Sequence, residues 1–345
     1  MSSIVYTQKG VEKRQSTQKD FSDITGVRKV KNKTKDTLPL DGYKFIDLFA
    51  GIGGIRIPFD ELGAKCVFTS EWDSKAQETY EANFGHKPQG DITKIREVDI
   101  PDHDILLAGF PCQPFSIMGE KNGFKDTRGT LFFEIERILK EKKPRVFLLE
   151  NVKNITTHDS GKTFQIIKKT LEDLGYNIHT KILNALDYEV AQKRERVIII
   201  GFLEKLNFIW PTSKERKNLL PNILENDKDV CKSLFASPEI AKKKKARLKI
   251  TPPIPSIWHE NKSGNVSPLH YSCALRAGAS YNYLLVNGLR RPSARELLRI
   301  QGFPDTFKIV VSYTQLRKQT GNAVSVPVIQ AVAKQISLVL IKKIK

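Results

Sequence analysis

One cysteine stands in a turn whose composition favours chemistry over packing. Cys112 lies in residues 109–116 (GFPCQPFS), directly after the apolar run 105–108. Pro111 precedes the thiol and a second proline follows two residues later, so the backbone is stiff on both sides. The chain's four cysteines are widely spaced, without a Cys-x-x-Cys pair, and indicate neither a disulfide framework nor a metal site. An isolated cysteine is usually an idle thiol, but this setting predicts a nucleophile that attacks as the thiolate.

Two further motifs supply groups that can act on a ring attacked by such a thiol. Glu150 ends the apolar run 146–149, and its carboxyl could protonate a ring nitrogen. Arg194 and Arg196 stand before the run 197–200, and rigid guanidinium groups hold a carbonyl oxygen or a phosphate well. Carbon 5 of cytosine reacts with a methyl sulfonium once a soft nucleophile has added at carbon 6, which explains a thiol, an acid and arginines together. Alone, the arginine motif could also be a surface charge cluster.

A glycine-rich turn follows the first apolar run and opens a helix. Residues 47–54 read DLFAGIGG, and such glycines let the backbone approach a ligand closely at a helix N-terminus. Glu71 ends the next run, 20 residues after Gly51, where a carboxylate can bind both hydroxyls of a ribose. Asp91 could accept a hydrogen bond from an adenine amino group, or could simply be a turn residue. By itself this pattern fits a nicotinamide enzyme, a methyltransferase or a purely structural turn.

Alternating strands and helices must position these groups. Strands are predicted at the apolar runs 45–49, 66–70, 105–108, 146–149 and 197–200. Helices are predicted at 74–83, 131–143, 163–174, 293–301 and 326–343. The alternation predicts an α/β fold with a parallel sheet covered on both faces. Because ligands bind at the carboxyl ends of such strands, Cys112 and Glu150 are expected on the same rim.

Composition divides the chain into four segments. Residues 1–41 are polar and basic, typical of a flexible extension or of a short DNA-touching arm. Residues 42–202 carry the motifs and predict a catalytic and cofactor-binding domain. Residues 203–288 are proline-rich and irregular, which predicts a smaller, loop-rich domain, and 289–345 return to the catalytic domain.

The charge is strongly positive and unevenly placed. The formal net charge is +19, and residues 201–300 hold 18 Lys and Arg against 8 Asp and Glu, whereas 101–150 hold eight of each. Such concentration predicts a nucleic-acid partner, the alternative being a solvated lysine-rich surface. No apolar run reaches the ~20 residues of a membrane span, and the first 37 residues lack the core of a signal peptide. A cytoplasmic protein without a membrane partner is therefore expected.

Together and in this order, the motifs closely resemble the DNA cytosine-5 methyltransferase family, in particular HhaI-type bacterial modification methyltransferases. The resemblance covers about residues 43–202 and 289–330. Its parts are 47–54, 71–73, 90–92, 109–116, 150–152, 192–196, 291–304 and 321–324. It implies a Rossmann-like sheet dependent on S-adenosylmethionine, with 203–288 as a target-recognition domain that reads DNA.

The resemblance implies roles for individual residues. Cys112 would add at carbon 6 of a cytosine flipped out of the duplex. Glu150, Arg194 and Arg196 would hold that cytosine. S-adenosylmethionine would be bound by Phe49, Gly51, Gly53, Glu71, Trp72, Asp91, Pro111 and Asn322.

DNA contacts are expected outside the base pocket. The loop 113–128 would close over DNA, with Met118 entering the gap left by the base or packing against protein, and Arg128 contacting DNA. Arg276 is expected to contact a base edge or a phosphate, although a solvent-facing or structural arginine is an open alternative.

The partners implied are double-stranded DNA and a cognate restriction endonuclease acting on the same site. The enzyme is expected to work as a monomer on the bacterial nucleoid. Three alternatives stand beside this interpretation. A tRNA cytosine-5 methyltransferase would share the catalytic motifs, a nicotinamide dehydrogenase would leave the Pro-Cys turn without a role, and an inactive DNA-binding regulator would not need Cys112, Glu150 and Arg196.

Overall fold

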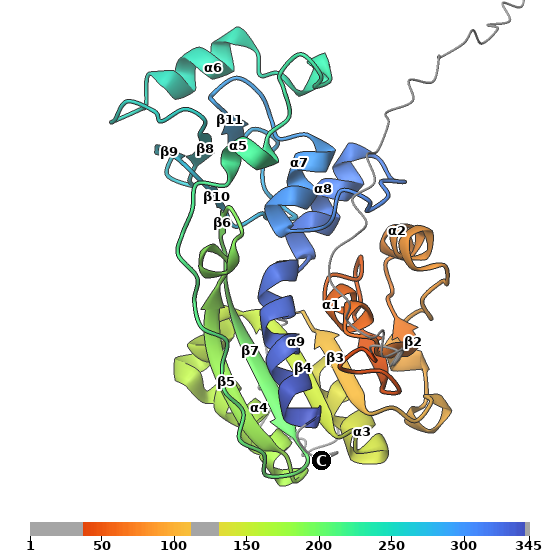
Figure 1. Ribbon diagram of the computed structural model, residues 1–345. Coiled ribbons are helices and arrows are strands. Elements are labelled where there is room, and N and C mark those ends of the chain that lie inside the picture. Colours follow the sequence, from red (N-terminus) through yellow and green to blue (C-terminus); the bar gives the residue numbers. More distant parts are fainter. Residues whose placement is uncertain (1–36, 112–130, 342–345) are drawn as a thin grey trace, which may run out of the picture. The chain divides into compact units, whose positions relative to one another are not determined.

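A six-stranded sheet forms the centre of the computed structural model, which describes residues 37–111 and 131–341 (Figure 1). The strands lie in the order β2–β1–β3–β4–β7–β5. They are β1 (Lys44–Leu48), β2 (Lys65–Ser70), β3 (Ile105–Gly109), β4 (Val146–Val152), β5 (Asn177–Asn184) and β7 (Glu195–Phe202). The first four run parallel, but β7 is antiparallel to both β4 and β5. All five predicted strands are present, and the prediction of an entirely parallel sheet was wrong because β7 reverses.

The strand that the sequence pattern missed is β5. It lies at the edge of the sheet, and most of its residues are exposed or half-buried. Its sequence, NIHTKILN, therefore lacks the continuous apolar run that marks the interior strands.

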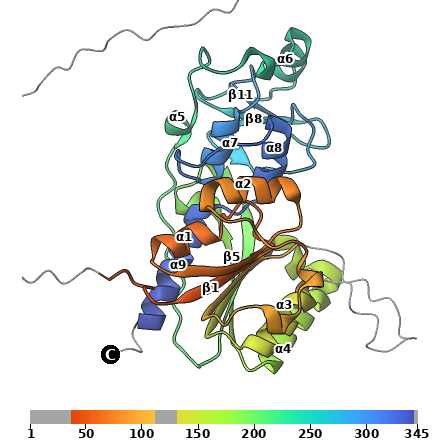
Figure 2. The same ribbon diagram turned by 90° about the vertical axis from the view of Figure 1, so that its right-hand side faces the viewer.

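Helices cover both faces of the sheet (Figure 2). On one face lie α1 (Arg56–Glu61) and α9 (Val326–Ile341), and on the other lie α3 (Leu131–Lys142) and α4 (Lys162–Asp173). Each pair shares an apolar cluster with the sheet residues beneath it. The stretch Tyr313–Ile341 is long and apolar enough to cross a membrane by length and composition alone, but more than half of its most apolar part is buried. The residues of α9 pack against α1 and the sheet, which identifies it as a core helix.

Three further helices border the carboxyl ends of the strands. They are α2 (Ser74–Phe84), α7 (Ala294–Gln301) and α8 (Tyr313–Asn322). Asp73 caps α2 by accepting hydrogen bonds from the backbone N–H groups of Lys75 and Ala76. The sequence did not predict α8, because YTQLRKQTGN is polar and has only one buried apolar side chain, Leu316.

Between β7 and α7 the chain forms short elements. An antiparallel sheet contains β8 (Ile257–Glu260), β9 (Val266–Leu269) and β11 (Leu284–Val286), and β6 (Gln192–Lys193) pairs with β10 (Ser272–Cys273). The helices here are α5 (Leu220–Ile223) and α6 (Pro238–Lys245). The 3-10 helices of the described chain are η1 (Ile92–Lys94), η2 (Glu97–Asp99), η4 (Lys153–Thr156), η5 (His158–Gly161), η6 (Ala185–Tyr188) and η7 (Lys232–Leu234).

By internal contacts the described chain from Leu38 onward is one compact unit, so 203–288 as a separate domain stays a prediction.

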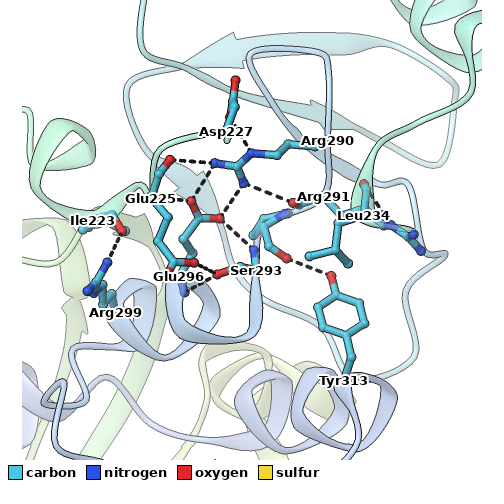
Figure 3. Close-up of polar contacts among 11 residues, drawn as sticks. Ile223, Glu225, Asp227, Leu234, Arg290, Arg291, Ser293, Glu296, Arg299 and Tyr313 are labelled. Carbon is cyan, nitrogen blue, oxygen red and sulfur yellow. Dashed lines mark hydrogen bonds and ion pairs between the residues drawn. The ribbon is translucent and has the colours of Figure 1, made fainter. Parts of the chain in front are cut away.

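A buried ion network fixes this region to the start of α7 (Figure 3). Arg290 is fully buried, and its two terminal nitrogens lie 2.8 Å from the two carboxylate oxygens of Glu296. Its Nε donates to Asp227 at 2.6 Å, and Nη2 donates to the Glu225 carbonyl at 3.0 Å. Glu296 also accepts from the Ser293 backbone N–H and closes a capping box. One guanidinium thus joins residues 225–227 to the helix that follows residues 203–288, here called the variable region.

Candidate active site

A cavity of about 620 Å³ opens where β1, β2, β3 and β4 end. Ten of the predicted site residues line it. They are Phe49, Gly51, Glu71, Trp72, Asp91, Pro111, Glu150, Arg194, Arg196 and Asn322. Groups separated by up to 273 positions in the chain therefore meet in one hollow, as expected for the carboxyl edge of an α/β sheet.

Some predicted residues are not among those lining the cavity. Cys112, Met118 and Arg128 fall in 112–130, outside the described residues, although Cys112 is bonded to Pro111, which lines the cavity. Gly53 is absent from the lining and has a positive φ of 83°. A Cβ at this position would lie 2.2 Å from the Phe84 ring, so this glycine allows α2 to pack closely against the turn.

The reversed direction of β7 brings the arginine motif to the acid. Val152 at the end of β4 pairs with Arg196 near the start of β7, and Glu150 pairs with Ile198. Arg196 Nε lies 2.9 Å from Glu150 Oε1. In a parallel sheet the start of β7 would lie on the opposite rim, so the antiparallel pairing is what assembles this part of the cavity.

Burial controls the protonation of Glu150. Its carboxyl is buried, and burial raises its pKa above the ordinary value, against the opposing effects of Arg196 and Arg194. The ion pair leaves Oε1 without a well-oriented hydrogen bond from any described residue. A carboxyl in this position can carry a proton closer to neutral pH than a solvated glutamate, which is what a general acid requires.

Both terminal nitrogens of Arg194 donate hydrogen bonds to backbone carbonyls. It is 3% exposed, Nη1 donates to Leu275 O at 3.1 Å, and Nη2 donates to Gly321 O and Ala323 O at 3.2 and 2.7 Å. Burial, together with the neighbouring Arg196, lowers its pKa to about 9. Its Nε is buried and meets no acceptor among the described residues. Arg194 therefore ties three loop carbonyls together, and its predicted contact with cytosine stays a prediction.

Two aromatic side chains, Phe49 and Trp72, line the other end of the cavity. Phe49 has a positive φ of 54°, a strained backbone that turns this residue along the cavity wall. Trp72 is 80% exposed although it lines the cavity, so its ring is free to cover a planar ligand.

Two carboxylates complete that end. Glu71 accepts hydrogen bonds from Gly51 N at 2.7 Å and Asp73 N at 2.8 Å, which fixes its orientation. Burial raises the pKa of Glu71, and these backbone donors lower it. The bonds shown for Asp91 both go to Oδ1, from the N–H and hydroxyl of Thr93, which leaves Oδ2 for a ligand within the described structure.

Sequence reasoning missed three residues of the site. Asn151 donates from Nδ2 to Phe110 O at 3.0 Å and so fixes the strand end that leads into Pro111. Its position next to Glu150 in the motif 150–152 could have identified it as a site residue. Lys318 and Gln319 line the cavity from α8, and Lys318 pairs with Asp73 at 2.6 Å. Since α8 itself was not predicted, no signal pointed to them.

Comparison with known sequences identifies the family. The model of the C-5 cytosine-specific DNA methylase family matches residues 43–338. The type II methyltransferase M.NgoBI of Neisseria gonorrhoeae is 60% identical over 296 residues, which cover 86% of this chain and 93% of the relative. M.HaeII of Haemophilus aegyptius is 60% identical over 291 residues (84% and 92%), and M.HhaI of Haemophilus parahaemolyticus is 42% identical over 310 residues (86% and 95%).

Solved structures share the fold at much lower identity. The crystal structure of S. pombe Dnmt2 methyltransferase has a TM-score of 0.65 at 20% identity, with 86% of this chain and 98% of that chain covered. The Entamoeba histolytica methyltransferase EhMeth has a TM-score of 0.67 at 19% identity, with 88% and 99% covered. Together with the family match and the strand-end cavity, these findings show that the chain belongs to the C-5 cytosine-specific DNA methylase family and is a DNA (cytosine-5-)-methyltransferase.

Proposed function

We propose that this enzyme methylates carbon 5 of a flipped-out cytosine through a covalent bond between Cys112 and carbon 6. The observation that carries the proposal is the Glu150–Arg196 pair in the cavity that Pro111 also lines, one peptide bond before the thiol. The cytosine-facing groups and the adenosyl-fitting wall belong to the same hollow, so base and cofactor can meet there.

Each protein group has a defined task in this mechanism. The Cys112 thiolate adds to carbon 6 while Glu150 gives a proton to ring nitrogen 3, which makes carbon 5 electron-rich. Arg196 holds Glu150 and donates to carbonyl oxygen 2. After methyl transfer, the proton on carbon 5 passes to water and the thiolate leaves carbon 6. The proton on nitrogen 3 returns to Glu150, which restores both the ring and the acid.

The cofactor proposed is S-adenosylmethionine, which when bound supplies an electrophilic methyl group on its sulfonium. Phe49 and Trp72 would enclose the adenine, Glu71 would hold the ribose hydroxyls and Asp91 would accept from the adenine amine. Gly51 shapes the turn and Asn322 supports the pocket from the end of α8.

The proposed substrate is double-stranded DNA read by residues 203–288. Arg276 is exposed there, as a base or phosphate contact requires, and Met118 and Arg128 are proposed as contacts from 113–128. Since the similar relatives are type II methyltransferases, we also propose that the protein acts as a monomer in the bacterial cytoplasm and protects DNA from a cognate restriction endonuclease.

DNA carrying 5-fluorocytosine tests the covalent step, because fluorine at carbon 5 cannot leave as a proton does and the adduct accumulates. The wild type and a Cys231→Ala control should form a stable protein–DNA adduct, since Cys231 is exposed and does not line the cavity. Cys112→Ala should form none while still binding S-adenosylhomocysteine. An adduct mapped by mass spectrometry to any residue other than Cys112 would refute the assignment.

A further inference from the structure

Helix α8 touches two different parts of the molecule with two of its faces. Thr314, Arg317 and Gly321, spaced as neighbours on one side of a helix, contact the loop 276–283. Lys318 and Asn322, one turn apart, line the catalytic cavity, and Gly321 borders both the cavity and the loop. A single helix outside the variable region thus borders both the reading region and the catalytic pocket.

Arg317 holds the centre of that loop. Its Nη2 donates to the carbonyls of Ala279 and Ser280, both at 3.1 Å. Its guanidinium carbon lies 4.2 Å from the centroid of the Tyr281 ring, a cation–π contact. Thr314 Oγ1 lies 2.6 Å from the Tyr281 hydroxyl. One side chain therefore fixes two successive carbonyls and the ring that follows them.

The remaining loop backbone is held from other sides. A Cβ on Gly321 would lie 2.3 Å from Ala277 N, so the helix end and the loop are in close contact. Lys244, buried in α6, donates to Asn282 O and pairs with Glu260 at 2.9 Å. The loop therefore enters and leaves its exposed section with its main chain fixed.

Two side chains of the loop stay accessible to solvent although the Tyr281 ring packs against α8. Arg276 is exposed, with its guanidinium carbon 4.9 Å from the Tyr283 centroid, and Tyr281 is 44% exposed. An exposed arginine and tyrosine on a rigid backbone can read base edges, because hydrogen bonds to bases require accurate placement.

We infer that Arg317 is a positioning residue for DNA sequence discrimination, acting by holding the carbonyls of Ala279 and Ser280 so that Arg276 and Tyr281 meet the bases in register. The inference rests on the proposed reading role of 203–288. It assigns specificity to a residue that lies outside that segment and touches no base itself.

The test measures kcat and KM on a DNA library with randomised positions around the methylated cytosine. Arg317→Met should lower the kcat/KM ratio between the best site and its best single mismatch by about tenfold, comparable with the loss of one base contact. The dissociation constant for S-adenosylhomocysteine should change by less than about twofold, since Arg317 does not line the cavity. Arg317→Lys should restore part of the ratio, because one ammonium can still reach a loop carbonyl.

Arg295→Met is the matched control, because Arg295 also donates to two loop carbonyls, those of Pro304 and Phe307, in another place. It should keep the wild-type ratio. If Arg317→Met fails to fold, Thr314→Val removes only the hydroxyl beside Tyr281 and should lower the ratio to a smaller extent. An unchanged ratio in the folded Arg317 and Thr314 variants, or an equal loss in Arg295→Met, overturns the inference alone. A wild type that methylates DNA without sequence preference overturns the proposed reading role, and this inference with it.

Discussion

In the proposed mechanism, Glu150 holds a proton at the start of the reaction and releases it to the base. Burial raises its pKa, while Arg196 and Arg194 favour the carboxylate, so the residue is poised between both states. A glutamine in its place keeps the shape and can donate a hydrogen bond but cannot deliver a proton.

Glu150→Gln should therefore lower the single-turnover methylation rate by about 10²–10⁴-fold, the usual contribution of a general acid. Affinity for S-adenosylhomocysteine should remain near the wild-type value. Glu195→Gln is the control, because Glu195 pairs with Lys153 at 3.4 Å in a half-exposed position. A Glu150→Gln enzyme within tenfold of the wild-type rate would show that protonation of the ring does not depend on this carboxyl.

Asp47 is a second buried acid, and its protonation affects the stability of the protein rather than the reaction. Both of its oxygens are buried and meet no hydrogen-bond partner among the described residues, and burial raises its pKa from 3.8 to about 8. The folded protein thus keeps this proton up to about pH 8, whereas the unfolded chain loses it near pH 4. The contribution of Asp47 to stability is complete below the unfolded pKa and is lost as the pH rises towards 8.

Asp47→Asn should remove the decrease in stability that Asp47 causes as the pH rises. The free energy of unfolding of the variant, relative to the wild type, should rise by up to about 1.4 kcal/mol per pH unit between pH 5 and 8 and level off above. Urea denaturation at four pH values measures it, with the exposed Asp102→Asn as a control that should parallel the wild type. Parallel curves for Asp47→Asn would mean that the folded state holds this carboxylate ionised.

At the residue scale, the sequence predicted those groups that stand at the ends of apolar runs. Glu71 and Glu150 could be placed on one rim because strand ends in an α/β sheet share an edge. The three carbonyl contacts of Arg194 could not be predicted, because Leu275 and Gly321 lie about 80 and 130 positions away and no periodic pattern links them. Asn151 was visible in its motif, but its bond to Phe110 depends on how β3 and β4 pair.

At the scale of elements, the apolar pattern of β7 predicts a strand, but only its hydrogen-bond pairing sets the direction of that strand. The apolar run 197–200 predicts a buried strand equally well in either orientation, since burial sets the run and hydrogen bonding sets the direction. The exposed edge strand β5 then follows from geometry, as the return strand that pairs with β7 over its whole length. The polar helix α8 was invisible because its contacts, and not its own periodicity, stabilise it.

The Arg290 network should contribute to stability by attaching the variable region to α7. Arg290→Met leaves Glu296 buried without its bidentate partner and should reduce the free energy of unfolding by about 3–5 kcal/mol. Chemical denaturation measures this effect. Arg96→Met removes a similar two-bond arginine–carboxylate pair, with Asp99, at an exposed site, and its stability should match the wild type. Equal stability of the two variants would show that the buried network does not hold the segment.

At the scale of the whole molecule, charge and family point to the same partner. The excess of Lys and Arg in residues 201–300 fits DNA better than a uniform lysine bias. The family match excludes the nicotinamide dehydrogenase alternative, and the similarity to type II methyltransferases disfavours a tRNA substrate. The family and its type II relatives likewise show an enzyme and not an inactive DNA-binding regulator.

DNA affinity should fall steeply with salt, because lysine and arginine displace counterions from phosphates. With six or more phosphate contacts, the binding constant should drop by about 10³-fold or more between 50 and 200 mM salt. Fluorescence anisotropy with a labelled duplex across this range gives the slope. A change of less than about tenfold would mean that the positive charge of 201–300 does not face the DNA.

The position of helix α9 near residue 330 affects how the protein folds during its synthesis. Its apolar side chains complete the core on the face of the sheet shared with α1, yet they are synthesised almost 300 residues after β1. At ordinary rates of translation the nascent chain waits roughly 15–60 s for that helix. During this interval the apolar side chains that α9 covers in the folded protein lack that helix, and chaperones can bind them.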